Sequence, residues 1–236
     1  MMGTVHLGTD SRTTAMKILV IGASRGIGLE LVRQYRDDGH AVTATARDDA
    51  GLQRLHALGA SALTLDVADA QSCSQLSWAL EGERFDIAIL VAGVYGPRLR
   101  EFETPSQADF DHVMHTNVLG PMRVLPLLVD AIAPGARVVL ISSRMGSIGS
   151  RSGASGSLYR ASKAAANSVL KDASIILGGR AVCIALHPGW VRTDMGGQGA
   201  ELDVADSVAD IRRTIARLGA ADNGQFFNHD GSPLAW

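Results

Sequence analysis

Three polar side chains near the middle of the chain have the types and the spacing needed to move a proton. Tyr159 and Lys163 stand four residues apart in a segment with helical periodicity, so both should project from one face of a helix. An ammonium beside a phenol stabilises the phenolate and lowers a pKa that is ordinarily about 10. Ser143 ends an apolar run of strand length, where its hydroxyl could hold a substrate oxygen. The set predicts a phenol that acts as an acid or base near neutral pH.

A glycine-rich turn gives this pair its context, because Tyr-x-x-x-Lys alone is commonly a pair on a helix surface. The apolar run 17–21 leads into this turn, and the amphipathic segment 26–37 follows. The turn consists of Gly22, Ala23, Ser24, Arg25, Gly26, Ile27 and Gly28. Glycine lets the backbone bend sharply and approach a pyrophosphate, which then sits at the amino terminus of the helix. The strand before and the helix after favour a dinucleotide site over a tight turn without a ligand.

The end of the second apolar run, 41–46, indicates which dinucleotide is bound. Arg47 follows this run at a place where NAD enzymes often have an acidic side chain for the ribose 2′-hydroxyl. A basic residue there accommodates the 2′-phosphate of NADP, and Arg25 could clamp the same phosphate. Asp48 and Asp49 come next and count against this interpretation. We expect NADP(H), with NAD(H) as the alternative.

Two further strand ends carry residues suited to the same cofactor. The third run, 61–65, is followed by Asp66 and Val67. Asp66 could accept the exocyclic amine of adenine, or it could cap the next helix. The fourth run leads to Ala92 and Gly93, small residues that let a flat ring lie against the backbone.

Apolar runs of strand length alternate with amphipathic segments of helix length. We expect strands at 17–21, 41–46, 61–65, 86–91, 137–142 and 181–186, and helices at about 26–37, 69–80, 106–131, 158–177 and 204–218. These units predict an α/β fold with a doubly wound parallel sheet of the Rossmann type. The long loops 93–105, 144–157 and 187–203 leave carboxyl ends of strands, where open sheets bind ligands. We expect one catalytic domain over residues 16–236 and a flexible N-terminal extension over residues 1–15.

Composition argues against several functional classes. The 236 residues, 46% hydrophobic and 19% charged, suffice for a packed core. A formal net charge of -2 without a basic run predicts no nucleic-acid or membrane partner, and no apolar run reaches the roughly 18 residues of a membrane span. Cys73 and Cys183 have neither disulfide nor metal spacing, which favours the cytoplasm. His112 and His115 lack partners with ligand spacing, so we expect no metal site.

Together these motifs resemble the short-chain dehydrogenase/reductase family over residues 16–236. The matching residues are Gly22, Gly26, Gly28, Asp66, Ala92, Gly93, Asn117, Ser142, Ser143, Tyr159, Lys163, Pro188 and Gly189. The resemblance implies a nicotinamide-dependent oxidoreductase with a catalytic tetrad of Asn117, Ser143, Tyr159 and Lys163. Ser143 is chosen over Ser142 because it matches the second serine of the family's Ser-Ser-x-x-Gly pattern.

The resemblance also implies a role for each member of the tetrad. Tyr159 would donate or accept the proton at the carbonyl or alcohol oxygen, and Ser143 would position that oxygen. Lys163 would bind the nicotinamide ribose and lower the pKa of Tyr159. Asn117 would hold a water molecule that links Lys163 to solvent.

Finer details resemble the C-factor-like carbonyl reductases within this family. They lie in three runs, 159–167, 187–197 and 226–236. This likeness implies that the Val191 backbone and the Thr193 hydroxyl hold the nicotinamide carboxamide. The chain departs from the family twice: Ala92 stands where asparagine is frequent, and Ile21 before Gly22 replaces a threonine whose hydroxyl can order the loop.

Two other functions stay open beside the reductase. A nucleotide-binding sensor or signalling protein would commonly have lost Tyr159 or Lys163, and both are present. An epimerase or dehydratase acting on a nucleotide sugar would usually have a longer segment after Pro188. For the reductase we expect a small carbonyl or alcohol substrate and a homo-oligomer. A largely apolar substrate pocket is indicated by Val94, Tyr95, Met145, Ile148 and Trp190.

Overall fold

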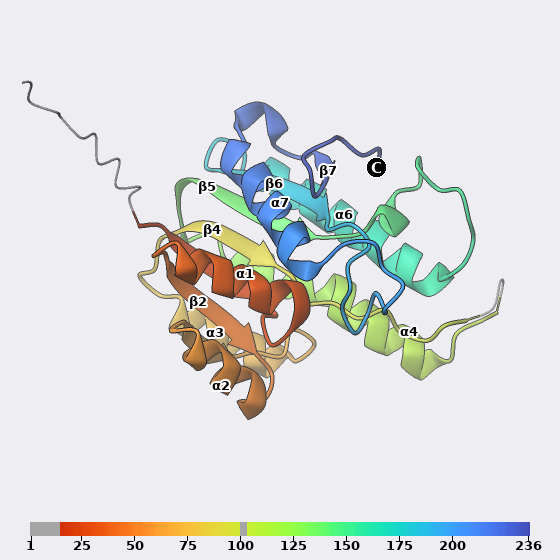
Figure 1. Cartoon of the computed structure of the whole chain (residues 1–236), viewed down its shortest axis with the longest axis horizontal. Coiled ribbons are helices and arrows are strands. Elements are labelled where there is room, and N and C mark those ends of the chain that lie inside the picture. The colour runs from red at the N-terminus through yellow and green to blue at the C-terminus, as the bar shows by residue number, and fades with distance from the viewer. Residues whose placement is uncertain (1–14, 100–102) are drawn as a thin grey trace, which may run out of the picture.

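A seven-stranded parallel sheet forms the centre of the computed structural model, which describes residues 15–99 and 103–236 (Figure 1). The strands are β1 (Lys17–Ile21), β2 (Ala41–Ala46), β3 (Ser61–Thr64), β4 (Phe85–Leu90), β5 (Ile132–Ile141), β6 (Ala181–His187) and β7 (Phe226–Asn228). Their order across the sheet is β3-β2-β1-β4-β5-β6-β7. The strand order reverses between β1 and β4, which opens a crevice at the carboxyl ends of these strands. The predicted doubly wound, single-domain Rossmann-type fold is confirmed.

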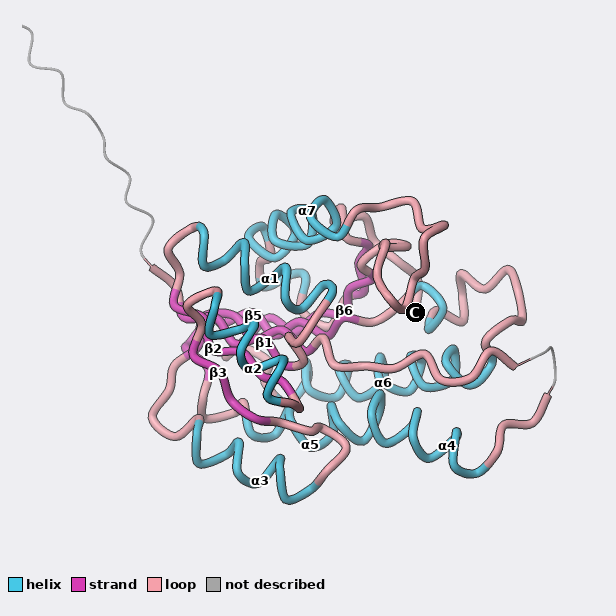
Figure 2. The backbone as a smooth tube through the Cα atoms, turned by 60° about the horizontal axis from the view of Figure 1, so that its bottom comes forward, coloured by secondary structure: helices cyan, strands magenta, loops and turns pink. Residues whose placement is uncertain are grey.

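Helices cover both faces of the sheet (Figure 2). They are α1 (Gly26–Asp37), α2 (Asp49–Ala57), α3 (Ala70–Ala79), α4 (Gln107–Met114), α5 (Gly120–Leu127), α6 (Ser157–Ile176) and α7 (Val204–Arg217). Helices α1, α2 and α7 lie on one face, and α3 to α6 lie on the other. Because successive strand side chains point to opposite faces, Ile18 and Val20 of β1 belong to the core cluster that includes residues of α1 and α7. Leu19 and Ile21 belong to the core cluster that includes residues of α5 and α6. Burial on both faces holds the central strands rigidly in place.

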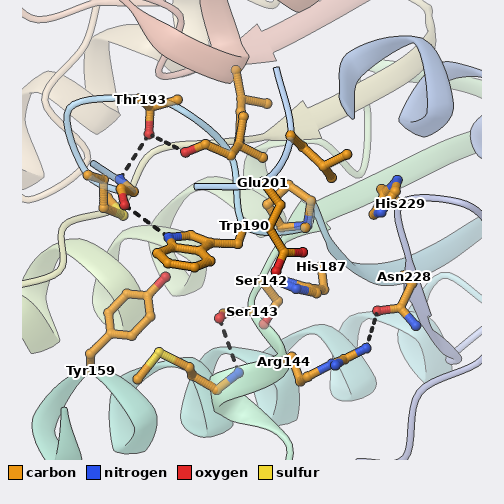
Figure 3. Close-up of a pocket in the computed structure, with 18 of the residues that line it drawn as sticks. Ser142, Ser143, Arg144, Tyr159, His187, Trp190, Thr193, Glu201, Asn228 and His229 are labelled. Atoms are coloured by element: carbon orange, nitrogen blue, oxygen red, sulfur yellow. Dashed lines mark hydrogen bonds between the residues drawn. The ribbon is translucent and has the colours of Figure 1, made fainter. Parts of the chain in front are cut away.

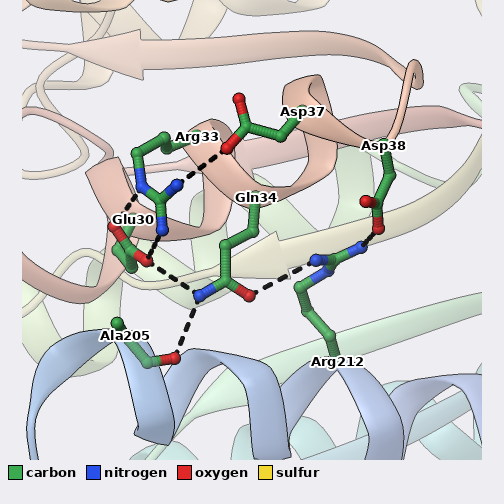
Figure 4. A network of polar contacts seen from close by, with 7 residues as sticks. All are labelled: Glu30, Arg33, Gln34, Asp37, Asp38, Ala205 and Arg212. Atoms are coloured by element: carbon green, nitrogen blue, oxygen red, sulfur yellow. Dashed lines mark hydrogen bonds and ion pairs between the residues drawn. The ribbon is translucent and has the colours of Figure 1, made fainter.

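A polar network joins α1 to α7, which lie on the same face of the sheet (Figure 4). Arg212 of α7 donates to the Gln34 side chain at 3.3 Å, pairs with Asp38, and lies over the Tyr35 ring at 4.5 Å. Gln34 in turn donates to the backbone carbonyl of Ala205 at 2.9 Å. These contacts fix α1, whose amino terminus faces the crevice, against the opposite end of the chain.

The six expected strands are present, and the structure corrects four details. The helix expected over 106–131 is interrupted by a π-turn at His115–Leu119 and ends at Leu127, one residue after Pro126, which has no N–H to donate. Strand β5 begins at residue 132 rather than 137, and a register shift against β4 accommodates the extra residues. Helix α2, with Asp48 as its N-cap, and the three-residue strand β7 were not predicted.

No helix in residues 15–99 or 103–236 is long and apolar enough to cross a bilayer. The expected N-terminal extension falls almost wholly on residues 1–14, which lie outside the described residues.

Candidate active site

Two adjoining cavities lie at the carboxyl ends of the strands. The first, about 440 Å³, is bordered by the glycine-rich turn and by the ends of β2, β3 and β4; we call it the glycine-loop cavity. The second, about 750 Å³, lies between the segment after β5, the loop after β6 and the segment after β7; we call it the outer cavity (Figure 3). Six residues border both: Ile27, Ser142, Tyr159, Pro188, Thr193 and Met195. A molecule bound in one cavity could therefore contact a molecule bound in the other at this junction.

Tyr159 lies at the junction of the two cavities. It is in the first turn of α6, is only 7% exposed, and stacks on Tyr95 with ring centres 4.7 Å apart. Burial raises the pKa of Tyr159 to about 12, and a hydrogen bond with Ser143 acts in the opposite direction. The sequence predicts instead a pKa lowered by Lys163. That prediction is wrong for this structure, because burial outweighs every stabilising contact of the phenolate.

Lys163 lies one helical turn after Tyr159 and borders the glycine-loop cavity. Its Nζ donates to the Ile141 backbone carbonyl at 3.0 Å and lies 5.8 Å from the centre of the Tyr159 ring. The side chain is 5% exposed, and burial lowers the pKa of Lys163 to about 8. The expected same-face geometry is present, but the ammonium is directed at a carbonyl rather than at the phenolic oxygen.

The two adjacent serines have different environments. Ser143 lies two residues after the end of β5 and borders the outer cavity, and its Oγ accepts a hydrogen bond from the Met145 N–H at 3.1 Å. Ser142 donates instead to the Asn167 side chain at 2.5 Å, within the buried part of α6. The structure therefore leaves Ser143 as the serine whose hydroxyl lies beside Tyr159.

Asn117 lies in the π-turn between α4 and α5 and borders neither cavity. Its side chain exchanges two hydrogen bonds of 2.8 Å with the Val94 backbone and donates to Ser162 at 2.9 Å. Asn117 Oδ1 and Lys163 Nζ would both lie 3.3 Å from a Cβ built on Gly93. The amide thus holds the loop after β4 against α6, directly behind Lys163, and a π-turn at such a place is common in functional sites.

The glycine-rich turn has no room for side chains at two positions. Gly22 has a φ of +85°, and a Cβ there would lie 2.7 Å from the Ala92 backbone. A Cβ on Gly28 would lie 2.4 Å from the Gly22 carbonyl oxygen, so Gly28 packs α1 against the turn. The Gly22 N–H donates to the Thr45 hydroxyl at 2.9 Å. Thr45 of β2 therefore supplies the loop-ordering hydroxyl that is missing at Ile21. This role of Thr45 follows from the pairing of β1 with β2 and could not be predicted from the local sequence.

The far end of the glycine-loop cavity is basic. Arg47 borders it, is exposed, and makes no ion pair with any residue in the described ranges. Asp48 is turned away, because its carboxylate caps α2 by accepting from the Gly51 N–H at 2.7 Å. Arg25 pairs with Asp194 at 2.9 Å, but both side chains are at least 70% exposed, and such pairs contribute little.

Asp66 borders the glycine-loop cavity and does not cap α3. One of its carboxylate oxygens accepts from the Ala68 N–H at 2.9 Å. The cap of α3 is Asp69, which accepts from the Ser72 N–H at 2.6 Å. Between the two roles considered for Asp66, the cap is ruled out.

Most of the residues expected at the cofactor border the glycine-loop cavity: Gly22, Ser24, Arg25, Gly26, Ile27, Arg47, Asp66, Val67, Ala92, Gly93, Tyr159, Lys163, Pro188 and Thr193. Gly189 and Val191 border the outer cavity instead, and Gly28 borders neither. The Thr193 hydroxyl accepts from the Gly196 N–H at 3.2 Å within the loop after β6, and the Thr193 methyl group would lie 3.4 Å from a Cβ built on Gly26 of the glycine-rich turn.

The outer cavity differs from the expected apolar pocket. Tyr95, Met145 and Trp190 border it, and the Trp190 indole is fixed by a 2.9 Å hydrogen bond to the Gly196 carbonyl. Val94 and Ile148 do not. The remaining wall includes polar and charged residues that the sequence reasoning missed: Arg144, His187, Glu201, Asn228 and His229. They come from separate segments of the chain, with Arg144 and Asn228 84 positions apart, and local sequence patterns do not reveal that such segments meet.

No group of three or more histidine, cysteine, aspartate or glutamate side chains suited to a metal ion occurs in the described part of the chain. His112 and His115 are both exposed, on α4 and in the π-turn.

Comparison with known proteins agrees with this geometry. The family model of the short chain dehydrogenases matches residues 16–202. C-signal from Myxococcus xanthus is 39% identical over 132 residues, which cover 55% of this chain and 80% of that protein. The 1-hydroxy-2-glutathionyl-2-methyl-3-butene dehydrogenase of Rhodococcus sp. (strain AD45) is 30% identical over 233 residues, which cover 93% of this chain and 99% of that protein.

Solved structures extend the likeness to the whole fold. The carbonyl reductase Sniffer of D. melanogaster superimposes with a TM-score of 0.85 at 32% identity, covering 94% of this chain and all of that one (100%). A carbonyl reductase from Pseudomonas aeruginosa PAO1 in complex with NADP gives a TM-score of 0.84 at 31% identity, again over 94% and 100% of the two chains. The chain therefore belongs to the short-chain dehydrogenase/reductase family of nicotinamide-dependent oxidoreductases, within the C-factor-like carbonyl reductase subgroup.

Proposed function

We propose that this chain is an NADP(H)-dependent carbonyl reductase in which Tyr159 handles the proton. One observation carries the proposal: Tyr159 borders both cavities, while Lys163 borders only the glycine-loop cavity and Ser143 only the outer one. A cofactor in the first cavity and a carbonyl compound in the second would meet at the phenol.

The glycine-loop cavity suits a nicotinamide dinucleotide. Gly22 lies so close to Ala92 that only a bare backbone fits there, which leaves the N–H groups at the start of α1 open to a pyrophosphate. Asp66 would reach the adenine end, and Lys163 and Thr193 would hold the nicotinamide end. When bound, the cofactor supplies a hydride at C4 of its nicotinamide ring.

The residues of the chain would then orient the substrate carbonyl group and transfer a proton to its oxygen. The Ser143 hydroxyl holds the substrate oxygen, and the Tyr159 phenol donates a proton to it. Asn117 acts through its neighbours, since it keeps the Gly93–Val94 backbone against Lys163. A pKa of about 12 keeps Tyr159 protonated at neutral pH, which is the form that donates a proton to a carbonyl oxygen.

The preference for NADP(H) rests on Arg47. This guanidinium borders the end of the cavity next to β2, has no ion-pair partner in the described ranges, and is not opposed by Asp48, which caps α2. Arg25 can leave its exposed pair with Asp194 at little cost and join Arg47 at a 2′-phosphate.

The test is oxidation of NADPH, followed by absorbance, with a panel of aldehydes and ketones. Tyr159→Phe should lower kcat by about a thousandfold or more and leave the Kd for NADPH within about twofold. Tyr35→Phe is the matched control, because it removes a phenolic hydroxyl that lies outside both cavities. Near-normal kcat in Tyr159→Phe would refute the assignment.

A second candidate is an NADP(H)-binding signalling protein that turns nothing over. The likeness to C-signal favours it, although Tyr159 and Lys163 would then have no task. Tight NADPH binding without turnover across the panel would support this candidate. For either function we propose a cytoplasmic location and a homo-oligomer, the latter tested by light scattering.

A further inference from the structure

Basic and amide side chains gather in the part of the outer cavity away from Tyr159. Arg144, His187, Asn228 and His229 all border the cavity and come from the ends of β5, β6 and β7. Figure 3 shows them on the side of the cavity opposite to the Tyr159 phenol, with Ser143 between. The proposed reaction uses none of these four residues.

Arg144 is a guanidinium without a counter-ion. Its only side-chain hydrogen bond within the described residues is a long one of 3.5 Å to the Asn228 amide oxygen, and no carboxylate in these ranges pairs with it. Arg160, which borders the same cavity, has no carboxylate partner in the described ranges either, but its Nε is held by a 2.8 Å hydrogen bond to the Ser155 carbonyl. Arg144 directly follows Ser143, and both residues border the outer cavity.

His187 adds a second unsatisfied group. Its Nδ1 is buried and has no hydrogen-bond partner among the described residues. Burial, together with the charges of Arg144 and His229, lowers the pKa of His187 to about 4, so the ring is neutral and can exchange a hydrogen bond with an occupant. Buried polar groups are nearly always satisfied, and an exception at a cavity wall points to a ligand.

Two of the acidic side chains near this cluster have partners other than Arg144, and one of them, Asp210, pairs within the cluster. Asp210 is engaged by His229 at 2.7 Å, and Asp230 accepts from the Ser232 N–H and hydroxyl at 2.9 and 2.7 Å. Glu201 is the exception, because it borders the cavity without an ion pair in the described ranges. Figure 3 shows it reaching in from the wall opposite to Arg144.

We propose that the outer cavity selects aldehydes or ketones that carry a carboxylate, with Arg144 as the receptor of that carboxylate and His187 and Asn228 as its hydrogen-bonding neighbours. The inference rests on the proposed reductase function, since it names the substrate class of the same site. A carboxylate on Arg144 forms charge-assisted hydrogen bonds in a fixed geometry and orients the carbonyl group toward Ser143 and Tyr159.

The experiment compares a charged aldehyde with its neutral counterpart, 4-formylbenzoate with methyl 4-formylbenzoate, by NADPH oxidation. We expect the ratio of kcat/KM for acid over ester to be about tenfold or more in the wild type and to fall to about one in Arg144→Gln, mainly through the KM for the acid. Arg144→Lys should restore part of the ratio, and Glu201→Gln should raise it. Arg151→Gln, the same charge change in the adjacent loop and outside both cavities, should leave the ratio unchanged.

A binding measurement separates this inference from the proposed function. Calorimetric titration of the full chain, with and without NADP⁺, compares 4-methylbenzoate with 4-methylbenzamide; the benzoate should bind more tightly, and Arg144→Gln should remove the difference. If no aldehyde is reduced, the proposed function fails and the titration alone decides the inference. Equal affinity for the two probes, or an acid preference that survives in Arg144→Gln, overturns it.

Discussion

Replacing Lys163 with methionine should stabilise the folded chain while it abolishes turnover. The ammonium is buried, has no carboxylate partner, and is held by one hydrogen bond to the Ile141 carbonyl. Methionine has a similar length and no charge, so it fills the space without the cost of removing an ion from water. A residue that costs stability at a cavity wall is the signature of a functional group.

The magnitude follows from the pKa of Lys163, which burial lowers from 10.5 to about 8. Because the folded-state pKa lies below the unfolded one, the unfolded chain binds more protons between these values, and stability rises with pH through this window. A shift of this size costs the folded wild type about 3 kcal/mol at pH 7 and about 1 kcal/mol at pH 10. In the variant the Ile141 carbonyl loses its donor, which reduces the gain in stability by about 1 to 2 kcal/mol.

The assay is chemical unfolding of wild type and Lys163→Met from pH 7 to pH 10. We expect the variant to be more stable than the wild type by about 1 to 2 kcal/mol at pH 7. At pH 10 it should be equally stable or slightly less stable, because the wild type alone gains about 2 kcal/mol over this range. Tyr35 and Tyr159, whose pKa values burial raises to about 12, titrate alike in both proteins and cancel in the difference. A difference that does not change with pH would refute the reasoning.

Three further substitutions test other parts of the site and the fold. Thr45→Val removes the acceptor of the Gly22 N–H, and we expect a loss of about 1 to 3 kcal/mol in the free energy of unfolding together with a higher Kd for NADPH. Arg47→Gln should raise the Kd for NADPH about tenfold and leave that for NADH unchanged, as measured by fluorescence titration. Arg212→Met removes the contacts with Gln34, Asp38 and the Tyr35 ring and should cost about 1 to 2 kcal/mol of stability by chemical unfolding.

Matched control variants distinguish these effects from nonspecific destabilisation. Thr43→Val makes the same change on the same face of β2 with no hydrogen bond to lose, and it should leave NADPH binding intact. Arg213→Met, next to Arg212 but 68% exposed, should stay within about 0.5 kcal/mol of wild type. An Arg47→Gln variant that weakens NADH as much as NADPH would show that Arg47 does not contact a 2′-phosphate.

Much of the fold could be predicted from the sequence because buried parallel strands are continuous apolar runs. Strands β1 and β2 have the predicted bounds, and α1 begins in the glycine-rich turn as expected. Two short elements were not predicted because their sequence signals are weak: α2 buries only Gly51 and Leu55, and β7 has three residues. The π-turn at Asn117 has no marker in the sequence, since the residues around it are compatible with an ordinary helix.

The candidate site was predictable where a motif is local and not where it is assembled from distant segments. Tyr159 and Lys163 share a helix, so their spacing placed them together. Thr45 and His187 could not be assigned a role, because each acts beside a residue more than 20 positions away. The direction of the Tyr159 pKa was wrong for a related reason: spacing shows which charge is near, whereas burial depends on the whole packed core.

The unfavourable features of the structure are concentrated at one edge of the sheet. The two core clusters are apolar and closely packed, yet the carboxyl ends of the strands hold a buried lysine without a counter-ion, a phenol with a raised pKa, and a histidine with an orphaned nitrogen. The buried ammonium and the orphaned nitrogen weaken the fold, whereas the phenol is neutral at pH 7 and packs on Tyr95. A bound molecule would give each group a partner: ribose hydroxyls for Lys163, a substrate oxygen for Tyr159, and a polar group beside Arg144 for His187. The packing of the apolar core offsets the free energy lost at the unsatisfied groups, and these groups remain free to bind cofactor and substrate.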